Sequence, residues 1–87
     1  MYNKYLEIFI EVADTGRFSK AAEKLYISST AIMKQMNLME QELGLSLLIR
    51  TNHGVSLTEA GKKIYKDAKI IIDYTNRSIN KAKTLQN

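Results

Sequence analysis

Hydrophobic residues recur every three or four positions in the first part of the chain, at Tyr5, Leu6, Phe9, Ile10, Val12 and Ala13. This spacing is that of one face of a helix, and it predicts a helix over about Tyr2–Asp14. Gly16 follows at the position where a left-handed residue ends many helices, because glycine adopts positive φ without steric cost. The first element is therefore expected to be an amphipathic helix that ends before Gly16.

A second, shorter helix is expected at about Lys20–Leu25. Ser19 precedes it and is the expected N-cap, because a serine hydroxyl can accept a hydrogen bond from a free amide of the first helical turn. Leu25 and Ile27 are expected to point into the core. The segment is thus predicted to be a short helix followed by a tight turn.

A third helix is predicted to follow the hydroxyl-rich run Ser28–Thr30, any residue of which can cap it. It should continue to about Leu43 and end at Gly44. Its expected buried stripe is Ile32, Met36, Met39 and Leu43, with offsets of three and four residues. Together with the second helix it forms a helix-turn-helix pattern over about residues 18–43, a weak signal because many short helical pairs only pack.

The pattern changes after Gly44, where two short runs, Leu47–Arg50 and Val55–Leu57, have the character of strands. The polar segment Thr51–Gly54 lies between them, so the region of about residues 47–57 is predicted to be a β-hairpin. A hairpin directly after a helix-turn-helix is the wing of a winged helix. The expected fold is therefore mainly α: three helices and a two-stranded wing, followed by a long C-terminal helix.

The last segment is predicted to be one long helix that Thr58 caps, with Glu59 at the positive end of the helix dipole. Apolar or small residues recur at helical spacing: Gly61, Ile64, Ala68, Ile71, Thr75, Ile79, Ala82 and Leu85. A helix of about 28 residues is about 40 Å long, which exceeds what a core of about 58 residues can cover. Its distal half therefore either pairs with another helix or frays in isolation.

Composition narrows the class of protein. A chain of 87 residues is one small domain, and its lack of cysteine excludes disulfides and cysteine zinc ligands. No long apolar run or secretory leader is visible, which fits a cytoplasmic protein. The net charge is +4, and the residues after position 16 are basic while the first 16 are acidic. Both a polyanion-binding surface and an ordinary solvated surface fit this distribution.

An enzyme is the poorest interpretation of the sequence. Glu40 and Glu42 are two residues apart on a predicted helix and so lie on different faces. His53 is the only histidine, which argues against a metal site or a histidine-based triad. No glycine-rich phosphate loop is present. We therefore expect no catalytic residues, no cofactor and no metal.

The residues of these elements resemble the N-terminal domain of LysR-type transcriptional regulators, up to about residue 75. The matching segments include residues 6–9, 16–22, 43–44 and, most specifically, 54–61, which reads GVSLTEAG. The resemblance implies a homodimer, often a dimer of dimers, formed through the long helix. It also implies a larger second domain that binds a small effector. No such domain lies within these 87 residues, so the chain is either a fragment or functions without one.

Three positions depart from the usual pattern of the family. Gln-Pro is usual where this chain has Ser29-Thr30, and serine is usual where it has Met33. Phenylalanine is common at the position of Leu48, which we interpret as a core exchange. The first two departures lie on the expected DNA-reading surface, so base contacts of the family cannot be transferred to them.

If the third helix enters the major groove, residues opposite its buried stripe should face the bases. These residues are Ser29, Thr30, Met33, Lys34 and Asn37. Asn37 could present both edges of its amide to adenine, and Lys34 could reach guanine or a phosphate. Thr30 and Met33 offer apolar contact to thymine methyl groups, which favours A·T pairs. The alternative is an ordinary solvated helix face.

A second group of residues is expected to contact phosphates or to form the wing contact: Arg17, Ser19, Lys20, Ser28, Arg50 and His53. Ser19 and Ser28 lie near helix N-termini, which attract anions, although each could serve only as a cap. Arg50 could instead anchor the hairpin. His53 lies at the wing tip, where the family often places an arginine that enters the minor groove.

The chain is thus predicted to divide into a DNA-binding domain, residues 1–58, and a linker and dimerisation helix, residues 59–87. The expected dimer contacts are Ile64, Ala68, Ile71, Thr75, Ile79 and Ala82. The predicted partners are double-stranded DNA and a second copy of the chain, in the cytoplasm at the nucleoid. The competing hypothesis is a small helical dimerisation module that never contacts DNA.

Overall fold

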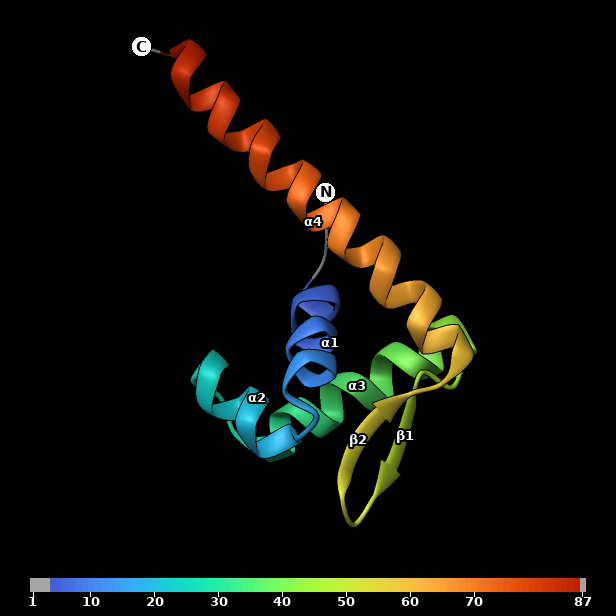
Figure 1. Cartoon of the computed structure of the whole chain (residues 1–87). Helices are drawn as coiled ribbons and strands as arrows, with labels where there is room; N and C mark the ends of the chain where they lie inside the picture. Colours follow the sequence, from blue (N-terminus) through green and yellow to red (C-terminus); the bar gives the residue numbers. More distant parts are fainter. Residues whose placement is uncertain (1–3, 87) are drawn as a thin grey trace.

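The computed structural model describes residues 4–86 and has the expected winged helix-turn-helix fold with a long final helix (Figure 1). Its elements are α1 (Lys4–Thr15), α2 (Phe18–Leu25), α3 (Ser29–Leu43), β1 (Leu48–Thr51), β2 (Gly54–Leu57) and α4 (Glu59–Gln86). The predicted start of the first helix, at Tyr2, lies outside the described residues. The order and type of every predicted element are confirmed.

The core forms where α1 packs on α2 and α3. Its largest fully buried side chains are Phe9, Val12, Ile32, Met36 and Leu47. These residues come from α1, α3 and the segment that leads into β1, so burying them together fixes the hairpin against the helices. Such burial is the main favourable contribution to the free energy of folding.

Two of the residues expected in the core are exposed. Leu43 is 48 % exposed because it lies in the last turn of α3, where it only borders a groove between α1, α3 and α4. Ile27 is 38 % exposed because it follows Tyr26, whose φ of +58° turns the chain away at the end of α2. Helical spacing alone does not show where a neighbouring element stops covering a stripe.

The caps of α3 follow the prediction, whereas the N-cap of α2 does not. The Ser28 hydroxyl accepts a hydrogen bond of 3.0 Å from the Ala31 amide, and Gly44 ends α3 with a φ of +67°. The α2 helix, however, begins at Phe18 with Arg17 as its N-cap, so Ser19 lies inside the first turn. Phe18 packs against the core, and this tertiary contact favours the earlier start.

The hairpin is antiparallel, with Leu48 opposite Leu57 and Thr51 opposite Gly54. Its first strand begins and ends one residue later than predicted, and its second strand begins one residue earlier. Its second strand docks on the end of α1, where the Val55 amide donates a 2.8 Å hydrogen bond to the Gly16 carbonyl. A Cβ on Gly54 would lie 2.5 Å from that same carbonyl oxygen. Glycine at position 54 therefore allows the wing to approach the helices closely.

The start of α4 is fixed to the segment before the hairpin. The Thr58 hydroxyl accepts from the Gly61 amide at 2.9 Å, which confirms the predicted cap, and donates to the Ser46 carbonyl at 2.6 Å. Further along α4, the Tyr65 hydroxyl donates to Asp14 at 2.5 Å, and this hydrogen bond raises the pKa of Tyr65. The helix then extends beyond the core (Figure 1). No helix within residues 4–86 is long and apolar enough to cross a membrane.

Replacing Gly61 by alanine should destabilise the protein, although alanine is the better helix former by about 1 kcal/mol. An added Cβ would lie 2.2 Å from the Leu47 carbonyl oxygen, so α4 would have to move away from the hairpin. We expect the free energy of unfolding, measured with urea at one protein concentration, to fall by about 1–3 kcal/mol. Asn76→Ala, at an exposed position of the same helix, is the control and should not destabilise. A Gly61→Ala variant as stable as the parent would contradict the close approach.

Candidate nucleic-acid interface

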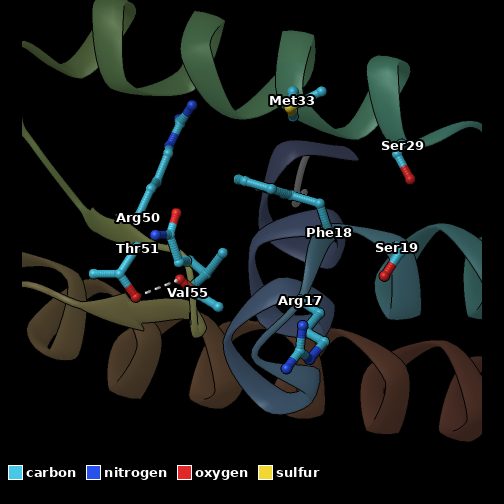
Figure 2. Close-up of a pocket in the computed structure, with 10 residues that line it drawn as sticks. Arg17, Phe18, Ser19, Ser29, Met33, Arg50, Thr51 and Val55 are labelled. Atoms are coloured by element: carbon cyan, nitrogen blue, oxygen red, sulfur yellow. Dashed lines mark hydrogen bonds between the residues drawn. The ribbon is translucent and has the colours of Figure 1, made fainter.

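An open hollow of about 330 Å³ lies between the N-terminal ends of α2 and α3 and the hairpin (Figure 2). Its lining residues are Arg17, Phe18, Ser19, Ser29, Met33, Arg50, Thr51, Asn52, Gly54 and Val55. Two guanidinium groups and several hydroxyls line it, and no carboxylate is among the lining side chains. The hollow therefore attracts anions, and two helix N-termini beside it add the positive ends of their dipoles.

Five of the residues predicted from the sequence meet in this hollow: Arg17, Ser19, Ser29, Met33 and Arg50. They come from α2, α3 and β1, and only the fold places them side by side. Phe18, Thr51 and Asn52 also line it, and the sequence reasoning did not identify them. A polar hairpin tip was the one available signal for Thr51 and Asn52.

The outer face of α3 lies opposite its buried stripe, as expected. Thr30, Met33, Lys34 and Asn37 are exposed there, and Ser29 is half-buried at the start of the helix. Ile32, Met36 and Met39 are buried on the inner face. The face of α3 that could enter a groove of DNA thus carries the residues that the sequence pattern selected.

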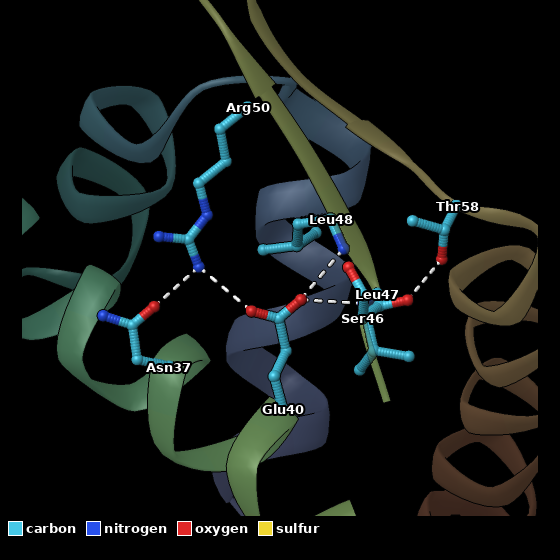
Figure 3. A network of polar contacts seen from close by, with 7 residues as sticks. All are labelled: Asn37, Glu40, Ser46, Leu47, Leu48, Arg50 and Thr58. Carbon is cyan, nitrogen blue, oxygen red and sulfur yellow. Dashed lines mark hydrogen bonds and ion pairs between the residues drawn. The ribbon is translucent and has the colours of Figure 1, made fainter. Parts of the chain in front are cut away.

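A network of polar contacts joins the hairpin to α3 (Figure 3). One carboxylate oxygen of Glu40 accepts from the backbone amides of Leu47 and Leu48, at 2.7 and 3.1 Å. The other oxygen lies 3.2 Å from Nη2 of Arg50. The same nitrogen donates to Oδ1 of Asn37 at 2.8 Å. Arg50 therefore anchors the hairpin to α3, which is the alternative role that the sequence suggested for it, and it also lines the hollow.

Glu40 is the structural residue that sequence reasoning missed. The sequence pattern marks it as one match to the family and weighs it as a catalytic pair with Glu42. Its partners Leu47, Leu48 and Arg50 lie seven to ten residues further along the chain. The Arg50 guanidinium also lies 5.2 Å from the centre of the Phe18 ring, which adds a cation–π contact. These five contacts together hold the base of the wing, α3 and α2 in one arrangement.

Three of the residues predicted to contact phosphates or to form the wing contact lie outside the hollow, namely Lys20, Ser28 and His53. Ser28 is engaged as the cap of α3. Lys20 lies beside Glu23 and Lys24 along α2. His53 is exposed at the hairpin tip, where its backbone amide donates to the Thr51 hydroxyl at 3.1 Å. Lys20 and His53 are therefore free to contact a ligand larger than the hollow itself.

The apolar stripe of α4 divides into a covered part and an open part. Ala68 and Thr75 are buried within the single chain, and Ile64 packs against the core. Ile71 and Ile79 are 43 % and 42 % exposed, and Ala82 is exposed as well. The covered residues are thus less available to a partner than the open ones. Within residues 4–86, no group of three or more His, Cys, Asp or Glu side chains could hold a metal ion.

Comparison with known proteins identifies the family. The family model described as bacterial regulatory helix-turn-helix protein, lysR family, matches residues 4–62. The chain belongs to the LysR family. It is 39 % identical to the HTH-type transcriptional regulator TcbR of Pseudomonas sp. (strain P51), over 86 % of this chain and 26 % of TcbR. The chain thus spans about a quarter of the length of that relative.

Solved structures of LysR-family DNA-binding domains have the same fold as this chain. The crystal structure of the CbnR_DBD–DNA complex superposes with a TM-score of 0.92 at 34 % identity, over all of both chains. That of the BenM_DBD/catB site 1 DNA complex gives 0.95 at 29 % identity, over 100 % of this chain and 97 % of the other. The chain therefore has the fold of the DNA-binding domains of CbnR and BenM, and its family is one of bacterial regulatory proteins.

Removing the carboxylate of Glu40 should loosen the wing. In Glu40→Ala, two backbone amides and Arg50 lose their acceptor, and we expect a loss of about 2–3 kcal/mol in the free energy of unfolding. Glu42→Ala is the matched control, because its carboxylate accepts only a 3.4 Å hydrogen bond from Tyr5 among the contacts of the described residues. Urea denaturation of both variants measures the difference. Equal losses in the two would show that Glu40 does not anchor the hairpin.

Proposed function

We propose that this chain binds specific sequences of duplex DNA, with α3 in the major groove and the wing in the adjacent minor groove. The observation that carries the proposal is the hollow at the ends of α2 and α3. It gathers the guanidinium groups of Arg17 and Arg50, the second of which pairs with Glu40, and no carboxylate is among its lining residues. A winged helix-turn-helix presents the start of its recognition helix to the bases, and that is where this hollow opens.

Residues on the outer face of α3 are proposed to read the bases: Ser29, Thr30, Met33, Lys34 and Asn37. Met33 is 37 % exposed, so its thioether and methyl group are available for apolar contact with thymine methyls. Because Ser29, Thr30 and Met33 are the positions at which the chain departs from its family, we place its individual specificity there.

Phosphate contacts are proposed for residues around the hollow and on the wing: Arg17, Ser19, Lys20, Ser28, Arg50 and His53. Arg17 and Ser19 line the hollow at the start of α2, where a phosphate oxygen would meet free backbone amides. His53 at the wing tip would reach the minor groove. The CbnR_DBD and BenM_DBD structures are complexes with DNA, and their similarity over the whole chain supports these assignments.

The second proposed partner is another copy of the chain, bound through α4. The open residues of the apolar stripe are Ile71, Ile79 and Ala82, and the two isoleucines are 43 % and 42 % exposed. Ile64, Ala68 and Thr75 support the same face of the helix from within the chain. We therefore divide the chain into a DNA-binding part, residues 1–58, and a linker and dimerisation helix, residues 59–87, acting at the bacterial nucleoid.

Binding to duplex DNA should weaken steeply with salt, because each neutralised phosphate releases counterions. Lys34→Glu should reduce affinity at least tenfold at low salt, an order-of-magnitude expectation for placing a carboxylate in the groove. Lys81→Glu makes the same change of charge near the far end of α4 and should have a much smaller effect. Fluorescence anisotropy with labelled duplexes measures both. If the parent chain binds no duplex at low salt, a helical module without DNA contacts becomes the better interpretation.

Placing aspartate at both Ile71 and Ile79 should yield monomers, because burying two carboxylates in an apolar seam costs more than the seam contributes. Light scattering would follow the mass, and circular dichroism would verify that the helices remain. A double variant with aspartate at Asn76 and Asn80 adds the same charge to exposed positions beside the stripe and should stay dimeric. A persistent dimer after the isoleucine changes would refute the proposed seam.

A further inference from the structure

Asn37 enters the proposed DNA interface with its carbonyl oxygen already engaged. Nη2 of Arg50 lies 2.8 Å from Oδ1 of Asn37. Because a guanidinium has donors and no acceptor, the atom of Asn37 that faces it must be the carbonyl oxygen and not the amide nitrogen. The contact therefore fixes which way round the amide is held, and its NH2 group remains free to meet a base.

Arg50 is itself held in place, so this orientation is built into the fold. Its Nη2 also lies 3.2 Å from Oε1 of Glu40, so each hydrogen of that nitrogen has an acceptor. The other oxygen of Glu40 accepts from the backbone amides of Leu47 and Leu48. The Phe18 ring supports the guanidinium at 5.2 Å. Figure 3 shows Asn37 and Glu40 on α3 with the Arg50 side chain reaching toward both from β1.

We propose that Arg50 is a positioning residue for base recognition: it presents Asn37 as a donor, so that Asn37 selects guanine rather than adenine. The inference rests on the proposed entry of α3 into the major groove. Adenine is read by an amide that donates to N7 and accepts from the N6 amino group, whereas guanine offers two acceptors, N7 and O6.

The guanidinium disfavours adenine in two ways. It takes one of the two acceptor positions of the oxygen that the adenine amino group would need. Its positive charge also lies beside the place where that amino group would bring partial positive charge, and the two repel each other. The two acceptors of guanine suit both the free NH2 of Asn37 and the nearby cation. The side chains on α3, taken one by one, predict a preference for A·T pairs. The contact with Arg50 changes the expected base from adenine to guanine at the one base pair that Asn37 reads.

The test is the selection of binding sites from random duplexes by the 87-residue chain and three variants. Asn37→Ala identifies the read position, because the preference at that base pair is lost. The parent chain should select guanine there. Arg50→Met, which keeps an unbranched apolar side chain beside Phe18 but has no donors, should free the amide to read adenine. We expect the ratio of guanine to adenine to change by roughly tenfold, the discrimination of one bidentate contact.

Arg17→Met is the matched control, because it removes the other guanidinium of the hollow without touching Asn37. It should weaken binding to all duplexes and leave the guanine preference unchanged. A loss of wing structure alone would weaken binding without exchanging one base for another. A switch from guanine to adenine is therefore specific to the proposed role of Arg50.

A second measurement uses the parent chain and modified DNA. It tests whether guanine is read even if Arg50→Met does not fold. Replacing the selected guanine by 7-deazaguanine removes N7, and replacing it by 2-aminopurine removes O6. At least one replacement should weaken binding by about fivefold or more. The inference would be overturned by unchanged affinity for both modified duplexes or by an adenine preference in the parent chain. It would also be overturned if Arg50→Met kept the guanine preference, or if Asn37→Ala lost no preference at any base pair. Failure of the parent to bind any duplex at low salt would instead refute the proposed function.

Discussion

The carboxylate of Glu40 is the group on which the arrangement of the proposed DNA-binding surface depends. It accepts from two consecutive backbone amides at the entry to β1 and from the Arg50 guanidinium, so one side chain of α3 fixes both the start and the middle of the first wing strand. A two-stranded hairpin is only marginally stable by itself in water. Its direction relative to the recognition helix must therefore come from such contacts. Because a hydrogen bond to an ionised acceptor is stronger than a neutral one, a carboxylate is well suited to this task.

The close approach of backbone segments also fixes the position of the hairpin, in addition to the contacts of Glu40. The hairpin docks on Gly16 through Gly54 and Val55, and the first turn of α4 passes over Leu47 at Gly61. A side chain at either Gly54 or Gly61 would hold these segments apart. The wing is therefore clamped between the end of α1 and the start of α4, which gives two elements of few residues the rigidity that DNA recognition requires. The hollow beside α2 and α3 is a consequence of this clamp.

The long helix α4 packs on its own core with some residues of its apolar stripe and leaves others open for the proposed second copy. Ile64, Ala68 and Thr75 face the interior of its own chain, whereas Ile71 and Ile79 are left open. One helix thus couples the domain that we propose binds DNA to the surface that we propose binds a second copy. A rigid connection of this kind would set the distance between two recognition helices, and hence the spacing of the half-sites that a dimer can occupy.

The sequence by itself determined the elements, the caps at Ser28, Gly44 and Thr58, and the outward face of α3, because hydrophobic period and capping chemistry act within a few residues. It did not determine that α2 starts at Phe18, that Leu43 and Ile27 are exposed, or that the stripe of α4 is divided. Nor did it connect Glu40 to Leu47, which are 7 residues apart, or Arg50 to Asn37, which are 13 residues apart. Those outcomes depend on which element covers which side chain and on how closely two backbones approach. Only the tertiary structure decides such distances, and with them which atoms of Asn37 remain free to meet DNA.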